Sequence, residues 1–236
     1  MNRVRILLVT AAVAAAIGVW LAFTAPVDSL QGEFSRIVNI HAPAMWVAFL
    51  AFGLTALASI MWLIRRTRGW DRLGEASAET GVVFTAVGLF TGMVWGQAVW
   101  GQAWDWGDAR LASTAVMFFV YLGYLALRKA TPDPEMRARR SAILGVIAVI
   151  QVPLVYFSVY IFRTLHQTPS LRPDGATMPR EMVLALLVNF ATLTYLFVAV
   201  LMARLEVARA EERFADDTGL AGDAVKPPRL SEVKDV

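Results

Sequence analysis

Cysteine is absent from this chain of 236 residues, and charged side chains are scarce at 17%. The absence of cysteine excludes disulfides, cysteine-ligated zinc, iron–sulfur clusters and a C-x-x-C-H site for covalent haem attachment. Any metal or cofactor must therefore be held by histidine, methionine, carboxylates or non-covalent packing. The chain also lacks a G-x-x-x-x-G-K-[ST] phosphate loop, so energy from ATP, if it is needed, must come from a partner.

Apolar residues dominate the composition. They make up 57% of the chain and give it a mean hydropathy of +0.54, which is too apolar for a soluble globule of this size. A bilayer core needs about 20 apolar residues per helix, and six segments approach this length: 6–25, 44–64, 81–97, 112–127, 142–162 and 182–203. We therefore predict an all-α bundle of six transmembrane helices over residues 1–203, kinked in the fifth helix at Pro153, and a polar cytoplasmic tail at 204–236.

The basic residues predict the orientation of this bundle. The net charge of the chain is +3, and most of its basic residues lie in short loops between apolar runs. This pattern indicates membrane topology and contact with membrane lipid, and we expect no nucleic acid partner. If the amino terminus is cytoplasmic, the only basic residues outside are Arg36, Arg110, Arg163, Arg172 and Arg180. Both termini are then cytoplasmic. A cleaved signal peptide is the alternative for the first segment, but its apolar run exceeds the usual length of about 7–15 residues, so we expect a retained helix.

Half of the tryptophans gather in the segment 95–113, WGQAVWGQAWDWGDARLAS, which joins the third and fourth helices. They are Trp95, Trp100, Trp104 and Trp106. Tryptophan favours the membrane interface, so this segment predicts either an interfacial belt or an aromatic platform on the outer surface. A platform with Asp108 and Arg110 beside it would suit a flat, apolar, partly charged ligand.

The chain has two histidines, His41 and His166, and the predicted topology places both on the outer side near the tryptophan segment. Each alone could be a hydrogen-bonded interfacial residue, and together they could be paired ligands; both interpretations are open at this point. Two neutral imidazoles saturate a haem iron, so such a site would carry haem without reacting with it. Pro43 predicts the first turn of the second helix, which places His41 near the positive end of the helix dipole and favours its neutral form.

A haem site also needs donors for two propionates. Arg110, at the end of the tryptophan segment, is the best-placed cation. An ion pair with Asp105 or Asp108, or contact with a lipid phosphate, would explain Arg110 equally well. Weaker candidates are Arg36, Arg163 and Arg172.

Four separated motifs occur in this chain in the same order as in a known family of membrane proteins. NIHAPAMW at 39–46 and RTLHQ at 163–167 are similar to its two histidine motifs, and ETGVVFTAVGLFTGMVWGQAVWG at 79–101 to the helix before its tryptophan segment. WGQAWDWGDARLAS at 100–113 resembles that segment itself, with Ala103 in place of a tryptophan and Gly107 as an extra residue. The family is haem exporter protein C (CcmC) of cytochrome c maturation, within the group that shares the "WWD" segment.

This resemblance implies a multi-pass protein of the bacterial inner membrane with a haem site on the periplasmic side. His41 and His166 would be the axial ligands of haem b. The tryptophan segment, with Asp108, would hold the porphyrin edge, and Arg110 would contact a propionate or a partner. The haem would be presented to the periplasmic chaperone CcmE, in a complex with CcmA, CcmB and CcmD. Such a protein is a carrier and not a metabolic enzyme, although it could assist the covalent attachment of haem to the chaperone.

Three other functions differ in what they require of the sequence. A permease subunit that moves haem through the bilayer predicts a second, inner haem site. Neither histidine is available for one, which argues against a histidine-lined path but not against a tryptophan-lined or lipid route. A haem b electron carrier needs a second bis-histidine haem to pass electrons across the membrane, which two histidines cannot supply. A scaffold whose histidines and tryptophans only anchor it among partners predicts a colourless purified protein.

Overall fold

The computed structural model describes residues 2–162, 164–168, 170–172 and 175–217. The elements are α1 (Asn2–Thr24), the 3₁₀ helix η1 (Glu33–Ile37), α2 (Val38–Arg65), α3 (Arg68–Trp100), α4 (Ala109–Lys129), α5 (Pro134–Ala148), α6 (Gln151–Ile161), β1 (Leu171–Arg172), β2 (Gly175–Ala176) and α7 (Arg180–Asp217). Within this part of the chain, six helical spans are long and apolar enough to cross a membrane, with α5 and α6 counted as one. The predicted all-α, six-helix membrane bundle is therefore confirmed.

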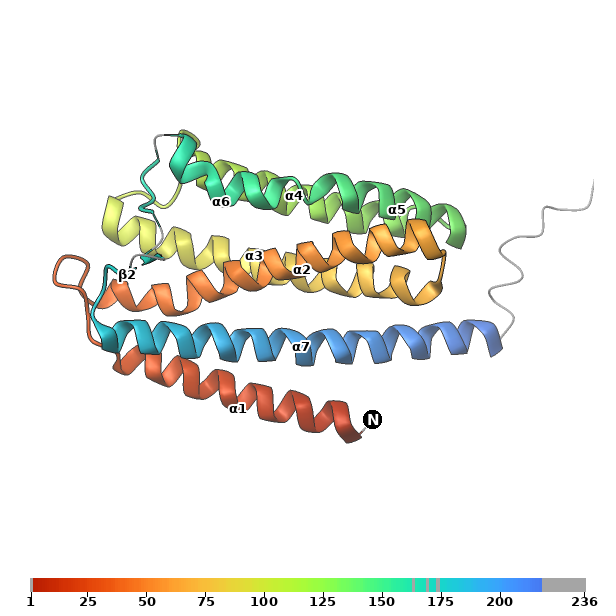
Figure 1. Cartoon of the computed structure of the whole chain (residues 1–236), viewed down its shortest axis with the longest axis horizontal. Coiled ribbons are helices and arrows are strands. Elements are labelled where there is room, and N and C mark those ends of the chain that lie inside the picture. Colours follow the sequence, from red (N-terminus) through yellow and green to blue (C-terminus); the bar gives the residue numbers. More distant parts are fainter. Residues whose placement is uncertain (1, 163, 169, 173–174, 218–236) are drawn as a thin grey trace, which may run out of the picture.

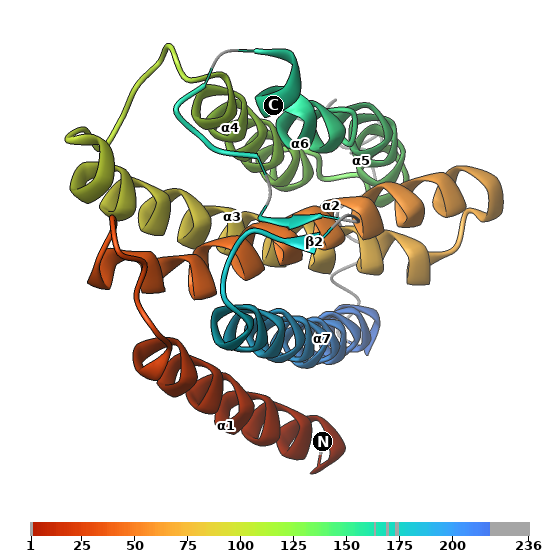
Figure 2. The same cartoon turned by 60° about the vertical axis from the view of Figure 1, so that its left-hand side comes forward.

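The helices form three layers. The α2–α3 hairpin lies in the middle, with α4, α5 and α6 on one side and α7, followed by α1, on the other (Figures 1 and 2). Small side chains allow close approach within the hairpin: a Cβ added at Gly81 of α3 would lie 2.5 Å from the ring of Phe52 on α2. Phe52 in turn stacks on Tyr121 of α4, with ring centroids 3.5 Å apart, so one core joins the middle layer to the next.

The predicted bend in the fifth span is a break between α5 and α6. Helix α5 ends at Ala148 and α6 begins at Gln151, so the break comes just before Pro153. Proline has no N–H to donate to the carbonyl of Val149, and the chain instead makes a tighter turn there, with the amide of Val152 bonded to that carbonyl at 3.0 Å. The break sets the direction of α6, whose last turn leads to the segment that carries His166.

Pro43 does not start α2, contrary to the sequence prediction. The helix begins at Val38, directly after η1, and Pro43 lies inside it. The helix therefore starts about one turn before Pro43, and Pro43 removes the hydrogen bond that its N–H would have made to the carbonyl of Asn39. His41 still lies in the first turn of α2, so its predicted place near a helix N-terminus is retained.

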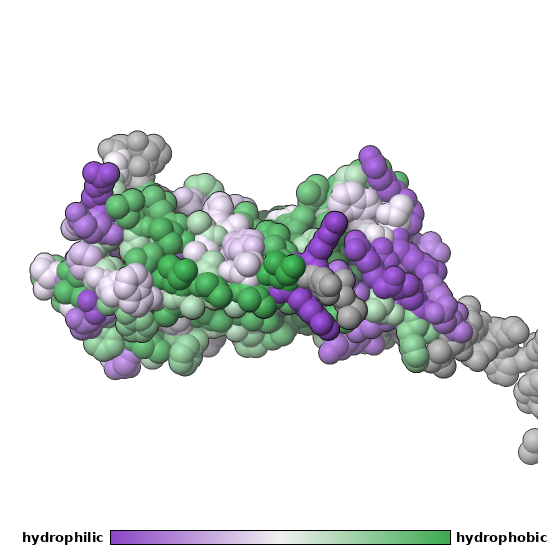
Figure 3. All heavy atoms as spheres, turned by 90° about the horizontal axis from the view of Figure 1, so that it is seen from below, coloured by the Kyte–Doolittle hydropathy of each residue, from purple (hydrophilic) through white to green (hydrophobic). Residues whose placement is uncertain are grey.

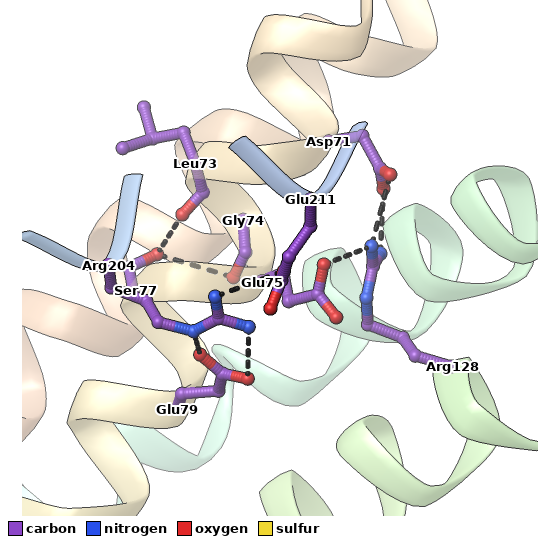
Figure 4. A network of polar contacts seen from close by, with 9 residues as sticks. All are labelled: Asp71, Leu73, Gly74, Glu75, Ser77, Glu79, Arg128, Arg204 and Glu211. Atoms are coloured by element: carbon purple, nitrogen blue, oxygen red, sulfur yellow. Dashed lines mark hydrogen bonds and ion pairs between the residues drawn. The ribbon is translucent and has the colours of Figure 1, made fainter. Parts of the chain in front are cut away.

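Helices α3 and α7 extend well beyond the apolar segments that predicted them. Their polar turns meet at the end of the bundle away from the histidines, where Arg128 of α4 is bonded to Asp71 and Glu75, and Arg204 of α7 to Glu79 of α3 (Figure 4). These pairs neutralise charges that would otherwise disfavour helices packed together in an apolar setting. Because α3 begins already at Arg68, the loop between α2 and α3 is short.

The outer surface has the polarity expected of a membrane bundle. On the face formed by α1 and α7, a hydrophobic band runs across the middle and hydrophilic residues gather toward both ends (Figure 3). The start of α1 and the end of α7 lie at the same end of the bundle (Figure 1), as an even number of spans requires. Helix α7 continues through residues 204–217, and the rest of the predicted tail, 218–236, lies outside the described residues.

Candidate functional site

A cavity of about 700 Å³ lies at the end of the bundle opposite the chain's start. Its walls come from α2, α3, α4, α6, α7 and the loops after α1, α3 and α6. This volume falls within the range typical of small-molecule and cofactor sites. Seven of the predicted site residues line it: His41, His166, Trp95, Trp100, Trp104, Asp108 and Arg110.

His41 projects from the first turn of α2 toward α3. Its Nδ1 lies 3.0 Å from the carbonyl oxygen of Gly88 and 3.3 Å from Oγ1 of Thr91. A carbonyl can only accept a hydrogen bond, so Nδ1 carries the proton and Nε2 carries the lone pair. Nε2 accepts no hydrogen bond from any of the described residues. The ring also rests against Gly92, where an added Cβ would lie 3.0 Å from Cε1.

His166 lies in the segment after α6 and has a different partner. Its Nδ1 lies 3.0 Å from Oδ1 of Asp108, and its amide donates to Oγ1 of Thr164 at 2.9 Å. Burial lowers the pKa of His166 below its ordinary value, although Asp108 acts in the opposite direction. The ring is therefore neutral at neutral pH, with Nδ1–H donated to the carboxylate and the lone pair on Nε2.

Asp108 is buried, with 1% of its surface exposed, and caps the N-terminus of α4. Burial would by itself raise the pKa of this carboxyl. The donors around it, from the Leu111 amide, the His166 ring and the Leu165 amide, outweigh that effect and lower the pKa. Gly107, the extra residue of the tryptophan segment, is accommodated in the turn before α4, where its amide donates to Oδ1 of Asp105. The extra residue therefore does not displace Asp108 from the site.

Three of the four tryptophans meet at the cavity. Trp95 and Trp100 belong to α3 and pack edge to face, with centroids 4.7 Å apart, and Trp100 packs in the same way on His166 at 4.8 Å. Trp104 lies in the loop before α4, and its buried Nε1 has no hydrogen-bond partner among the described residues. Trp106 does not line the cavity: it is 70% exposed and packs against Trp104 at 5.0 Å.

Arg110 reaches the cavity from the first turn of α4. Its Nη2 donates to the carbonyl of Tyr156 at 3.0 Å, and its buried Nε has no partner among the described residues. It makes no salt bridge with Asp105 or Asp108, so the ion pair that was the alternative explanation for Arg110 is not formed in this structure. A guanidinium without an ion-pair partner, in a largely apolar cavity, is suited to an acidic group on a ligand. Of the weaker candidates, Arg36 does not line the cavity and Arg163 lies outside the described residues.

Several groups at the site were not predicted from the sequence. Gln31, in the loop after α1, accepts the indole N–H of Trp95 at 3.0 Å. The carbonyls of Gly88 and Tyr156 hold His41 and Arg110. Every residue has a backbone carbonyl, so the sequence does not show which carbonyls hold a side chain. Gln31 belongs to no motif. Only the fold could therefore identify these partners.

The donor set limits what the cavity can bind. Within the described residues, no three His, Cys, Asp or Glu side chains gather, so the two histidines are not part of a metal site built from protein ligands alone. Two neutral imidazoles can complete the coordination of a metal that brings its other ligands with it, as haem iron does. The tryptophan walls and the unpaired guanidinium fit the apolar plane and the acidic groups of such a molecule.

Comparisons with known proteins place the chain among proteins with a common name. The sequence profile of the family described as "Heme exporter protein C" matches residues 1–218. The chain is 37% identical over 201 residues to a "Heme exporter protein C" of Bradyrhizobium diazoefficiens, covering 84% of this chain and 76% of the relative. It is 33% identical over 196 residues to the "Heme exporter protein C" of Escherichia coli, covering 81% and 80%.

A mitochondrial relative extends the same similarity. A "putative cytochrome c biosynthesis ccmC-like mitochondrial protein" of Marchantia polymorpha is 33% identical over 185 residues, covering 78% of this chain and 77% of the relative. The resemblance noted from the motifs is therefore confirmed over most of the chain. The chain belongs to the heme exporter protein C family.

Proposed function

We propose that this protein handles haem for cytochrome c maturation, binding haem b as cargo at the outer face of the cytoplasmic membrane and presenting it to the chaperone CcmE. His41 and His166 would be the axial ligands. The observation that supports this most directly is that both imidazoles line one cavity with Nδ1 held by an acceptor, which leaves each Nε2 free to ligate. The names of the relatives support the haem and cytochrome c parts of the proposal.

The other lining residues receive roles from their contacts. Trp95, Trp100 and Trp104 would cover the porphyrin, and the unpaired Nε1 of Trp104 is a donor available to the cargo or to a water. Arg110 would hold a propionate. Trp106, exposed at the edge of the same loop, would contact the chaperone or the lipid surface. Ligation by His41 and His166 would protect the iron from reaction with oxygen while the haem is held.

The partners follow from the family and from what the chain lacks. The sequence has no phosphate loop, so ATP would be used by the partners CcmA and CcmB, with CcmD as a further subunit of the complex. The excess of basic residues at the end of the bundle away from the cavity supports placing that end in the cytoplasm and the cavity on the periplasmic side.

The visible absorption spectrum of the protein, purified with its partners from haem-replete cells, tests this proposal. We expect a bis-imidazole haem spectrum in the wild type that is altered or lost in His41→Ala and in His166→Ala. A wild type that carries no haem, or variants that both keep the wild-type spectrum, would overturn the assignment of the ligands.

A further inference from the structure

We propose that Asp108 acts on the cargo only through His166, as a positioning residue that makes the two axial ligands unequal. The inference rests on the proposed haem-presenting function. The resemblance implies that Asp108 holds the porphyrin directly. We infer that it acts instead through its hydrogen bond to the ring of His166.

The contacts of Asp108 show that both of its carboxylate oxygens accept hydrogen bonds from inside the protein. Oδ1 accepts from the Leu111 amide at 2.9 Å and from Nδ1 of His166 at 3.0 Å, and Oδ2 accepts from the Leu165 amide at 2.7 Å. These donors belong to two parts of the chain, the start of α4 and the segment after α6. Asp108 therefore fastens the segment that carries His166 to the start of α4.

A direct contact between Asp108 and the cargo is disfavoured by the same geometry. Its oxygens already accept three hydrogen bonds, and a carboxylate would repel the propionates of haem. Arg110, two residues away, has the opposite charge and an unpaired Nε, so it is the better partner for an acidic group.

The two histidines differ in the acceptor that holds Nδ1. For His41 the acceptor is a neutral backbone carbonyl, and for His166 it is a carboxylate. A carboxylate acceptor draws the Nδ1 proton more strongly and raises the basicity of the other ring nitrogen, as in the carboxylate–histidine pairs of metal sites. With haem bound, His166 would therefore be the stronger donor to iron and His41 the weaker one.

A purely structural role is the competing explanation, since Asp108 also caps α4. Asn and Ser are as good as Asp at a helix N-cap, so Asp108→Asn and Asp108→Ser keep that role. Asn cannot replace the carboxylate toward both His166 and the Leu165 amide, because its amide nitrogen is a donor; Ser is too short to reach either. Asp133 provides a matched control, since it caps α5 by accepting from the Met136 amide at 2.7 Å and lies away from the cavity.

The test uses the complex purified from haem-replete cells, with wild type, Asp108→Asn, Asp108→Ser and Asp133→Asn compared. The reduction potential of the bound haem is measured by titration, and haem retention by transfer to apomyoglobin. We expect both Asp108 variants to raise the potential, because a weaker donor stabilises the ferric iron less, and to lose haem about 10- to 100-fold faster. Asp133→Asn should match the wild type in both measurements.

A second measurement tests the fastening role without haem. In the protein from haem-depleted cells, we expect the amides of residues 164–168 to exchange with deuterium faster in both Asp108 variants than in the wild type and in Asp133→Asn. A wild type that holds haem, with Asp108 variants of unchanged potential and retention, would overturn the role of Asp108 while leaving the proposed function intact. A wild type that never holds haem would overturn the proposed function and, with it, the inequality of the ligands.

Discussion

At the scale of single residues, Gly92 fixes the position of His41. The absence of a side chain at Gly92 gives the imidazole the space it occupies between α2 and α3, since an added Cβ would lie 3.0 Å from its Cε1. A larger residue there must push the ring away from the Gly88 carbonyl that sets its tautomer.

We therefore predict that Gly92→Leu weakens haem binding. Overpacking of this kind costs about 1–3 kcal/mol. If this cost destabilises only the haem-bound state, the affinity falls by about 5- to 150-fold. Haem titration followed by absorbance measures the change. Gly53→Leu is the control, because a Cβ at Gly53 meets nothing within 4 Å. Equal affinities for the two variants would contradict the supporting role of Gly92.

Arg110 allows a second prediction at this scale. Arg110→Gln removes a guanidinium that has no ion-pair partner. We expect the free energy of haem binding to weaken by about 1.5–3 kcal/mol, the usual contribution of a hydrogen bond to a charged group. Arg110→Lys should recover part of it, since it keeps the charge without the planar fork. Retention of haem against apomyoglobin measures both. Arg36→Gln, at a cation that pairs with Glu33 outside the cavity, should leave retention unchanged; an equal loss there would count against a specific role for Arg110.

The sequence predicted the side chains of the site better than their partners. His41, His166, Asp108 and Arg110 were found because their residue types carry the relevant chemistry and the apolar runs placed them on one side. The bond between Asp108 and His166 was not predicted, because it joins positions 58 residues apart that only the packing of α4 against α6 brings together. Trp106 is the opposite case. It belongs to the same tryptophan segment as Trp95, Trp100 and Trp104, but it does not line the cavity.

At the scale of helices, charged pairs join the polar turns of neighbouring elements. The apolar runs predicted all six spans, but not the polar turns by which α3 exceeds its run. Acids in those turns pair with basic residues of other helices, such as Glu79 with Arg204 (Figure 4). Pairing across helices depends on the tertiary arrangement and leaves no periodic signal in one segment.

Arg128 is the most buried member of these pairs, and its removal should be costly. Its side chain is 2% exposed and bonds to Asp71 and Glu75, which are themselves only partly exposed. We predict that Arg128→Met lowers the free energy of unfolding by about 3 kcal/mol, the lower end of the range for breaking a buried pair. Thermal unfolding in detergent measures this change.

The control for this prediction is the exposed pair between Arg68 and Asp216. Arg68→Met should change stability by less than about 1 kcal/mol, because water screens such a pair. Arg128→Met should also leave the haem spectrum of the surviving folded protein unchanged, since it lies at the end of the bundle away from the cavity. A spectrum altered as much as the stability would mean that the two ends are coupled.

At the scale of the whole molecule, the two ends of the bundle have different compositions and would face different compartments. The cavity end contains the histidines and the tryptophan loop, and the other end contains the ionic pairs and most of the basic residues. Since the start of α1 and the end of α7 lie together at the second end, a single orientation fixes the location of both described ends and of the cavity.

The absence of cysteine makes this orientation directly measurable, because any introduced thiol is the only one. Leu30, 95% exposed in the loop at the cavity end, and Ala130, exposed between α4 and α5, lie at opposite ends of the bundle. We predict that Leu30→Cys reacts with a membrane-impermeant maleimide in intact spheroplasts, whereas Ala130→Cys reacts only after the membrane is permeabilised. The reverse pattern would place the cavity in the cytoplasm, where a periplasmic chaperone could not collect haem from it.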